Sequence, residues 1–460
     1  MTSSINPQIF REYDIRGIVG KDLTPESVAS IGKAIGTYIR RGGGKTMILG
    51  RDVRSSSIEF RDILAEVLNS TGCDVIDIGM VPTPVTYFAL HHFKADGGVM
   101  ITGSHNPPEF NGFKISQGLH SLYGEKVQEL KKLIEANDFE TGTGTTKQQP
   151  VLDDYMEKIC SILKIPRNVK VVVDGGNGCF GIVGPKLLRK MGQDPIEIFS
   201  EPDGTFPNHH PDPTVAKHLT HLIEKVRSEN AELGIGFDGD ADRIGVVDDK
   251  GNILWGDQLL TIFARDILSR NPGATIVGEV KCSQNLYQDI EKHGGVPVMA
   301  AAGHSLIKNK MRETGALLAG EMSGHICFAD NYYGFDDAIF AACRILKIVA
   351  ESKQKVSEML TDLPATASTP EIRIDCPDEK KFEIVRELTE FFREKYDVID
   401  IDGVRVNFDG GWALVRASNT QPVLVLRFEA INEVRLQELI VLVKKQMDKY
   451  QPVVQFDYQP

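Results

Sequence analysis

The chain has 460 residues, more than the roughly 250–300 residues at which a single hydrophobic core stops growing, so two or more domains are expected. Hydrophobic residues make up 41% of the chain and charged residues 25%, which argues against a disordered or fibrous protein. The formal net charge of −12 argues against a general nucleic-acid-binding protein, because duplex affinity rests largely on Lys and Arg side chains.

Location and redox state follow from simple patterns. The opening MTSSINPQIF lacks the basic start and apolar core of a signal peptide, and no apolar stretch approaches the roughly 20 residues that span a bilayer. We therefore expect a cytoplasmic protein with no membrane partner. The seven cysteines have no zinc-type spacing and are expected to be reduced.

One local pattern occurs three times in the first part of the chain. A short apolar run ends in Gly or Asp and precedes a segment with helical periodicity. The predicted strands are 45–52, 169–176 and 274–281, and the helices that follow them are 58–70, 185–192 and 285–294. This alternation predicts parallel strands with helical crossovers, and hence three related α/β domains.

The last part of the chain has a different pattern, with hairpin-like strands flanked by helices. Strands are expected at 371–377, 398–408, 411–418 and 422–430, and helices at 380–396 and 434–450. Such an order is typical of an α+β domain. Joints at 140–150, 252–257 and 363–370 divide the chain into four predicted domains: 1–150, 151–255, 256–368 and 369–460.

The segment ITGSHNPPEFNGFKI (101–115) presents Ser104 on a loop. The apolar run before it stops at Gly103, and the prolines after Asn106 prevent a helix from starting at once. His105 and Lys114 are nearby in sequence, as a nucleophilic serine would require. A polar turn without chemistry is the alternative for this loop taken alone.

Three carboxylates alternate along DGDADR (238–243), between two strand-like runs. Asp238, Asp240 and Asp242 can converge on one hard cation, and Mg²⁺ suits such a site if a phosphate oxygen completes its shell. An EF-hand is excluded because Arg243 occupies the sixth position, where that loop needs Gly. A solvated acidic turn is the alternative.

The same stretch contains a misleading glycine pattern. Gly234, Gly236 and Gly239 have the GxGxxG spacing of a dinucleotide-binding turn. That turn should end a strand and open a helix, whereas an acidic loop and a second strand follow here. We therefore reject a dinucleotide site.

Two further loops carry polar side chains. GEMSGH (320–325) brings together Glu321, Ser323 and His325, which suits pairs of sugar hydroxyls, general acid–base chemistry or a structural turn. RASNTQP (416–422) lies between two strands and is either a phosphate cradle or an ordinary hairpin loop. Its candidate ligands are Arg416, Ser418, Asn419 and Thr420.

In this order the motifs resemble the α-D-phosphohexomutase superfamily, and GEMSGH resembles its phosphomannomutase/phosphoglucomutase branch. The resemblance runs from FREYDIRG (10–17) through TGSHNP, DGDADR, GHS (303–305) and GEMSGH to RASNTQP. It implies four domains around a central cleft: three related α/β domains with mixed sheets and a C-terminal α+β domain like the TATA-binding protein.

The resemblance also implies roles for individual residues. Ser104 would carry the phosphoryl group and, through its phosphate, bind Mg²⁺ together with the three aspartates, with Arg243 beside them. Glu321 and Ser323 would hold sugar hydroxyls, and the RASNT loop would grip the phosphate that is not transferred. Further substrate-binding candidates are Tyr13, Arg16, Lys281 and His325. Lys114 and His304 are our choices for proton transfer.

The implied reaction interconverts hexose 1-phosphate and hexose 6-phosphate through a phosphoserine enzyme and a hexose 1,6-bisphosphate, which is also the expected activator. Met322 favours mannose and glucose, because phosphoglucosamine mutases usually read GEQSGH. That mutase, a hydrolase acting through phospho-Ser104 and a non-catalytic sugar-phosphate-binding homologue are the alternatives. We expect sugar phosphates as partners, no nucleic acid, and a monomer, with an oligomer left open.

Overall fold

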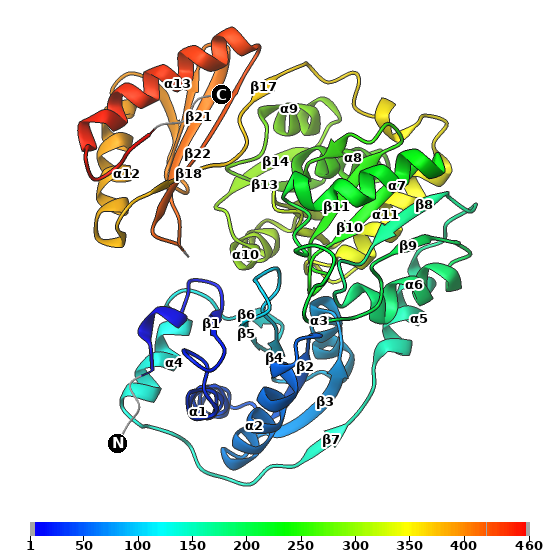
Figure 1. The fold of residues 1–460 in the computed structure, drawn as a ribbon, viewed down its shortest axis with the longest axis vertical. Helices are drawn as coiled ribbons and strands as arrows, with labels where there is room; N and C mark the ends of the chain where they lie inside the picture. Colours follow the sequence, from blue (N-terminus) through cyan, green and yellow to red (C-terminus); the bar gives the residue numbers. More distant parts are fainter. Residues whose placement is uncertain (1–4, 420, 457–460) are drawn as a thin grey trace.

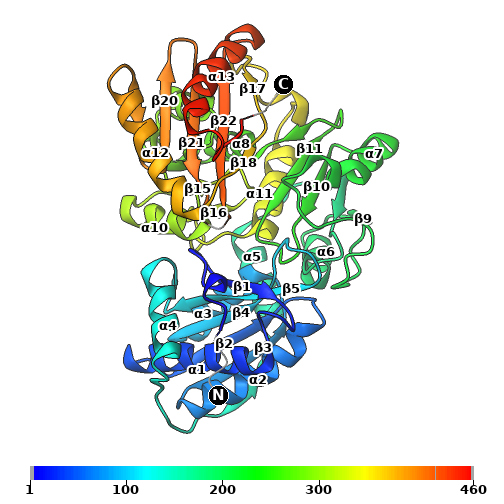
Figure 2. The same cartoon turned by 60° about the vertical axis from the view of Figure 1, so that its left-hand side comes forward.

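The computed structural model describes residues 5–419 and 421–456, which build four β-sheets in succession along the chain (Figure 1). Figures 1 and 2 both place the first sheet and its helices at the bottom and the C-terminal sheet at the top left. We call these four sheets with their helices the first to fourth units. Within the described ranges, no helix combines the length and apolarity needed to cross a bilayer.

The first unit has a seven-stranded sheet of order β1-β5-β4-β2-β3-β7, with β6 paired to β5. Its strands are β1 (Ile15–Ile18), β2 (Thr46–Arg51), β3 (Asp74–Met80), β4 (Gly97–Ile101), β5 (Phe110–Gln117), β6 (His120–Ser121) and β7 (Thr146–Gln148). Its helices are α1 (Pro25–Arg41), α2 (Ser56–Ser70), α3 (Thr83–Phe93) and α4 (Glu125–Glu135).

The second and third units are smaller. The second contains β8 (Val171–Asp174), β9 (Ile196–Ile198), β10 (Leu233–Phe237), β11 (Ile244–Asp248), β12 (Ile253–Leu254), α5 (Leu152–Ile162), α6 (Phe180–Lys190) and α7 (Thr220–Glu229). The third contains β13 (Thr275–Glu279), β14 (Val296–Ala300), β15 (Leu318–Gly320), β16 (Ile326–Phe328), α8 (Gly256–Arg270), α9 (Gln284–Lys292), α10 (His304–Thr314) and α11 (Ala338–Glu351).

These three units share one topology. Each has three adjacent parallel strands, namely β4-β2-β3, β10-β8-β9 and β15-β13-β14. Each then adds an antiparallel strand beside the last parallel one: β5 beside β4, β11 beside β10, and β16 beside β15. The loops 102–109, 238–243 and 321–325 connect these antiparallel pairs, so three predicted functional loops occupy equivalent positions.

The fourth unit is an antiparallel sheet with helices on one face. Its strands are β17 (Ala367–Ser368), β18 (Ile372–Asp375), β19 (Asp397–Ile399), β20 (Val404–Phe408), β21 (Gly411–Ala417) and β22 (Val423–Ala430), and its helices are α12 (Asp378–Arg393) and α13 (Glu433–Met447). Alternate residues of a strand face opposite sides of a sheet. Ala413 and Val415 therefore join the core under the helices, whereas Trp412 and Leu414 pack on Val280 of the third unit.

The hydrophobic cores separate the fourth unit from the first three. One continuous cluster of buried side chains joins the first three units, from Ile48 through Val171 to Leu318. The fourth unit has a separate core around Phe392 and Phe428. The first three units thus share apolar packing, while the fourth meets the third mainly through the small cluster at Trp412 and a set of polar contacts.

Two predictions of single elements differ from the structure. The strand expected at 398–408 is two antiparallel strands, β19 and β20. The helix expected at 185–192 begins at Phe180 and keeps Pro185 in its second turn. The three predicted joints stay predictions, and each contains a short strand, β7, β12 or β17, that pairs with a neighbouring strand. Backbone pairing of this kind satisfies N–H and C=O groups whatever the side chains are.

Candidate functional site

Ser104 lies in the loop between β4 and β5 and is buried, with a left-handed backbone (φ 49°). Its Oγ donates a hydrogen bond to Oδ2 of Asp238 at 2.9 Å and lies 3.1 Å from Nδ1 of His105. The side chain of Ser104 thus points from the first unit directly at the aspartate loop of the second.

Asp238, Asp240 and Asp242 lie in the loop between β10 and β11 and are fully buried. One carboxylate oxygen from each lies within 4.8 Å of the others. Oδ1 of Asp240 and Oδ1 of Asp242 are buried without a hydrogen-bond partner among the described residues. Unpartnered buried carboxylate oxygens are the ligands that a hard divalent cation requires, so these residues fit a Mg²⁺ ion.

Lys114, on β5, provides positive charge at this cluster. Its Nζ donates to Oδ2 of Asp240 at 2.7 Å and to Oδ2 of Asp242. Burial acts to lower the pKa of Lys114, but the two carboxylates outweigh it and hold the pKa well above its usual range. Burial, together with repulsion from Asp242 and Asp240, raises the pKa of Asp238 well above its usual range.

Two histidines share one buried carboxylate on the other side of the cluster. Nδ1 of His325 lies 3.0 Å from Oδ2 of Asp336, and Nδ1 of His304 lies 3.5 Å from the same oxygen. The two rings stack with centroids 5.3 Å apart. Nε of Arg243 lies 3.0 Å from Nε2 of His325, which connects the aspartate loop to the GEMSGH loop. Burial and the charge of Lys308 lower the pKa of His304 well below its usual range.

Glu321 and Ser323 lie in the loop between β15 and β16. Oε1 of Glu321 accepts a hydrogen bond from the backbone N–H of Gly303 at 2.7 Å. Its Oε2 is buried without a hydrogen-bond partner among the described residues. This oxygen is an available acceptor for a sugar hydroxyl. Ser323 is half-buried two residues further along the same turn.

Tyr13 connects three units. Its hydroxyl donates to the carbonyl of Ala302 at 2.7 Å and accepts from Nδ2 of Asn419 at 3.0 Å. Arg16, on β1, pairs with Asp14 and with Oδ1 of Asn106 in the serine loop. Tyr13 therefore lies where the first, third and fourth units meet, whereas Arg16 lies beside the Ser104 loop.

The cationic candidates of the third and fourth units are paired with carboxylates. Nζ of Lys281 lies 3.6 Å from Glu279 and 3.3 Å from Glu371. Nε of Arg416 donates at 2.9 Å to Asp402, whose carboxylate also accepts from the N–H of Ala302. Ser418 is buried beside Arg416 in the same loop. Thr420, also predicted for this loop, lies outside the described residues.

The predicted residues therefore form two groups joined by the segment 302–304. One group surrounds Ser104 and contains the three aspartates, Lys114, Arg243, His304 and His325. The other lies between the third unit, Tyr13 and the fourth unit, and contains Glu321, Arg416 and Asn419. The first suits phosphoryl chemistry, and the second suits recognition of an anionic polyol.

Several residues of the site escaped sequence reasoning. Thr83 donates to Oδ2 of Asp240, Asp336 supports both histidines, and Asp402 links Arg416 to the 302–304 segment. None lies in a loop with an evident chemical pattern. Their buried polar character appears only after folding, so one sequence offers no signal for them.

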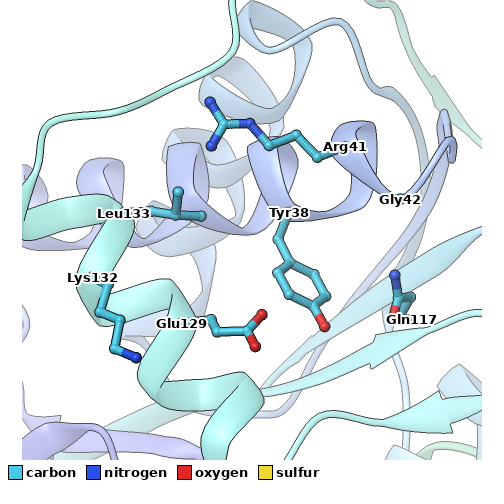
Figure 3. Close-up of a pocket in the computed structure, with 7 residues that line it drawn as sticks. All are labelled: Tyr38, Arg41, Gly42, Gln117, Glu129, Lys132 and Leu133. Carbon is cyan, nitrogen blue, oxygen red and sulfur yellow. The ribbon is translucent and has the colours of Figure 1, made fainter.

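A separate surface hollow of about 430 Å³ lies on the first unit between α1 and α4 (Figure 3). Tyr38, Glu129 and Gln117 face it, together with Arg41, Gly42, Lys132 and Leu133. Arg41 is engaged by Asp138 and Glu140 at 2.8 and 2.9 Å. Among the described residues, the hollow is lined by none of those predicted for the site.

Four segments of the chain match the domains of one protein family, described as phosphoglucomutase/phosphomannomutase. Residues 7–141, 153–251 and 255–367 match its alpha/beta/alpha domains I, II and III, and residues 371–446 match its C-terminal domain.

Individual relatives match over nearly the whole chain. Phosphomannomutase/phosphoglucomutase of Pseudomonas aeruginosa strain PAO1 is 47% identical over 440 residues, covering 95% of each protein. Phosphoglucomutase of Neisseria gonorrhoeae is 43% identical, covering 95% of this chain and 96% of that protein. The crystal structure of a phosphoglucomutase/phosphomannomutase family protein from Burkholderia thailandensis matches with a TM-score of 0.93 and 42% identity, covering 99% and 100%.

Proposed function

The chain belongs to the phosphoglucomutase/phosphomannomutase family and is a hexose phosphate mutase, and from this we propose that Oγ of Ser104 carries the phosphoryl group in transit. The observation that carries the proposal is the 2.9 Å hydrogen bond from this Oγ to Asp238, within a buried carboxylate cluster. A phosphate on Ser104 would add acceptor oxygens at the edge of that cluster.

Asp238, Asp240 and Asp242 would hold Mg²⁺ together with the Ser104 phosphate. When bound, the ion would neutralise charge that develops on the phosphoryl oxygens. Lys114, already bonded to two of the carboxylates, would keep the local charge balanced, and Arg243 would add planar donors for phosphate oxygens.

In the proposed reaction, a hydroxyl oxygen of the hexose phosphate attacks phosphorus, and the bond from phosphorus to Oγ of Ser104 breaks. The hydroxyl proton passes to a base, and the departing Oγ takes up a proton. The products are Ser104 with a free hydroxyl and a hexose 1,6-bisphosphate. After the bisphosphate turns around, Oγ of Ser104 attacks the phosphorus of its other phosphate and gives its proton to a base. The bond from that phosphorus to the sugar oxygen breaks, and the sugar oxygen takes up a proton. The enzyme is thereby phosphorylated again.

His304 is our choice for the base. Burial and the nearby charge of Lys308 favour its neutral form, which can accept a proton, and Asp336 faces its Nδ1. Lys114 would supply charge and a proton to the departing oxygen. The sequence predicted proton transfer for both His304 and Lys114. In this proposal His304 accepts a proton and Lys114 donates one.

The second group of residues would hold the sugar and its resting phosphate. Glu321, with one free buried oxygen, and Ser323 would bind sugar hydroxyls. Arg416, Ser418, Asn419 and Thr420 would bind the phosphate, with Tyr13 and Lys281 around them. Arg16, beside the Ser104 loop, and His325, in the first group, would contact the substrate near Ser104. The cations in this group offset the charge of a dianionic ligand in a protein whose net charge is negative.

We further propose mannose and glucose phosphates as substrates, a hexose 1,6-bisphosphate as activator, and a monomer acting in the cytoplasm. The domain division 1–150, 151–255, 256–368 and 369–460 stays a prediction. Conversion of mannose 1-phosphate, glucose 1-phosphate and glucosamine 1-phosphate should be compared with Mg²⁺ and catalytic bisphosphate. A preference for glucosamine 1-phosphate would overturn the substrate proposal.

Replacing the serine tests the phosphoryl carrier. Ser104→Ala should lower turnover by roughly 10³-fold or more, because the covalent route is lost. Mass spectrometry should find phosphate on Ser104 in the parent. Ser228→Ala, an exposed serine on α7, is the control and should keep parental turnover. Parental activity in Ser104→Ala would refute the proposal.

A further inference from the structure

Arg54 lies in the connection from β2 to α2, behind the Ser104 loop, and is 1% exposed. All five of its guanidinium N–H groups meet acceptors. Nε donates to Asp52 (3.2 Å), Nη1 to the carbonyls of Pro107 (2.5 Å) and Phe110 (2.9 Å), and Nη2 to the carbonyls of Ser104 (2.9 Å) and Asn106 (2.5 Å). Four of these acceptors are backbone carbonyls, three from the Ser104 loop and one from the first residue of β5, so the loop curls around a single side chain.

The fit between Arg54 and the loop leaves no spare room. A methyl group at Gly103 would lie 2.6 Å from the guanidinium carbon, and the N–H of Gly103 donates to Asp52. The second unit closes the other side, where the ring of Phe206 lies 5.1 Å from the guanidinium. Arg54 is thus fixed by two units and can hold the loop in one arrangement.

The loop needs such a support for two reasons. Ser104 has φ 49°, and a residue other than glycine in that region costs about 1–3 kcal/mol unless its surroundings hold it there. Pro107 and Pro108 have no N–H and cannot join a regular hydrogen-bond ladder. Inward-facing carbonyls therefore need side-chain donors, and unpaired buried carbonyls would be costly.

We propose that Arg54 is a positioning residue for phosphoryl transfer, which keeps Oγ of Ser104 at the carboxylate cluster by binding the carbonyls of residues 104, 106, 107 and 110. The inference rests on the proposed role of Ser104 as phosphoryl carrier. Arg54 bonds backbone and Asp52 rather than the residues proposed to hold the sugar. Its loss should therefore affect the chemical step more than sugar-phosphate binding.

Arg54→Lys tests this separation. Lysine keeps the charge but has three donors in place of five, so at least two acceptors lose their partner. We expect kcat to fall by about 100-fold, as for a misplacement of about 1 Å, while KM for the hexose phosphate changes less than about threefold. Phosphoryl transfer from the isolated phosphoenzyme to sugar phosphate, measured in a single turnover, should slow by the same factor as kcat.

Arg344→Lys is the matched control. Arg344 is also buried, binds Asp266 and Asp330 at 2.9 and 3.0 Å, and stacks on Phe328, but lies on α11 away from Ser104. It should lower Tm as Arg54→Lys does and leave kcat unchanged. If both variants lose kcat equally, or if Arg54→Lys keeps parental kcat, or if its KM rises in step with the loss of kcat, the inference is overturned.

Gly103→Ala repeats the test if Arg54→Lys does not fold, because its methyl group would push the guanidinium away. A fall in kcat with unchanged KM supports the inference, and parental kcat overturns it. Mapping phosphate on the parent separates the two proposals. If the parent carries none on Ser104, the phosphoryl carrier itself is wrong; if it does and both variants behave like the parent, only the role of Arg54 is wrong.

Discussion

Lys114 supplies the positive charge that faces two of the three clustered carboxylates. Asp240 and Asp242 are fully buried, and Nζ of Lys114 donates to both. Removing one partner of a buried ion pair leaves an uncompensated charge in a medium of low polarity. Charge balance at this cluster should therefore depend on either the lysine or a bound cation.

Lys114→Met should destabilise the metal-free protein by about 3–5 kcal/mol, and Mg²⁺ should restore part of that loss. Urea unfolding with and without Mg²⁺ measures both effects. Arg344→Met removes one of the two arginines that bind Asp266 and Asp330, away from the cluster, and leaves Arg270 as their partner; it should be destabilised without relief by Mg²⁺. Equal relief in both variants would contradict a specific site at the aspartates.

His209 provides a pH-dependent contribution to stability. Burial acts to lower its pKa, but the hydrogen bond from Nε2 to Asp174, at 3.0 Å, outweighs burial and raises the pKa above its usual value. A group whose pKa is raised by folding stabilises the protein below its unfolded pKa of about 6.5 and loses that contribution as pH rises through the folded pKa.

Asp174→Asn should therefore cost more free energy of unfolding at about pH 5.5 than at about pH 9. Urea unfolding of parent and variant at both pH values gives the two differences. The neighbouring His210, His218 and His221 are present in both proteins, so their contributions cancel in this comparison to first order. A loss that is equal at both pH values would mean that the pair contributes no charge interaction.

At the scale of elements, the site depends on close approach of the serine and aspartate loops. A methyl group at Gly239 would lie 2.4 Å from the carbonyl oxygen of Ser104, the same oxygen that Arg54 binds. Gly239 thus allows two equivalent loops, from different units, to touch through their backbones.

Gly239→Ala should separate these loops, lowering stability by about 1–3 kcal/mol and kcat by about 10- to 100-fold. Gly236→Ala is the control, because the nearest neighbours of its methyl group would be the side-chain ends of Leu219 and Leu222, at 3.1 and 3.5 Å, and no backbone atom. Thermal unfolding and steady-state kinetics of the two variants check the expectation. Equal kcat in both would show that loop separation is not critical.

Much of this element organisation could be predicted from the sequence. The apolar runs before Ser104, Asp238 and Glu321 indicated strands that end in functional loops, and those strands are β4, β10 and β15. Edge strands were missed, because β7 has exposed polar residues and pairs only through its backbone with β3. The start of α6 was missed because proline is common in the first turn of a helix, whereas Pro185 follows five helical residues here.

At the scale of the whole molecule, the fourth unit contacts the third through the Trp412 cluster and Arg405, and near the RASNT loop it also meets the segment 302–304 and Tyr13. Asp402 binds both Arg416 and the N–H of Ala302, and Asn419 donates to the Tyr13 hydroxyl. Because the fourth unit has its own core, it can move as a body while these polar contacts break and re-form. The RASNT loop would then close over the substrate.

Arg416→Ala should weaken this closure. We expect KM for the hexose phosphate to rise by about tenfold or more, as for loss of a charged hydrogen bond of about 1.5–3 kcal/mol, and more bisphosphate to escape during turnover. Isotope-labelled bisphosphate recovered from solution measures escape. Arg435→Ala, in α13 and bonded to Glu438, is the control. Unchanged escape and KM in Arg416→Ala would rule out the closing role.

The sequence by itself determined the local features: which runs become strands, which loops end them, and which loops carry carboxylates, a serine or a phosphate cradle. These depend on residues adjacent in the chain, through alternation, prolines and glycines. Tertiary structure alone decided that Arg54 binds the Ser104 loop, that Asp336 lies between two histidines, and that Tyr13 meets Asn419 across the chain. Such pairs are set by how the units pack, because buried polar groups take partners from whatever chain segment folding brings beside them.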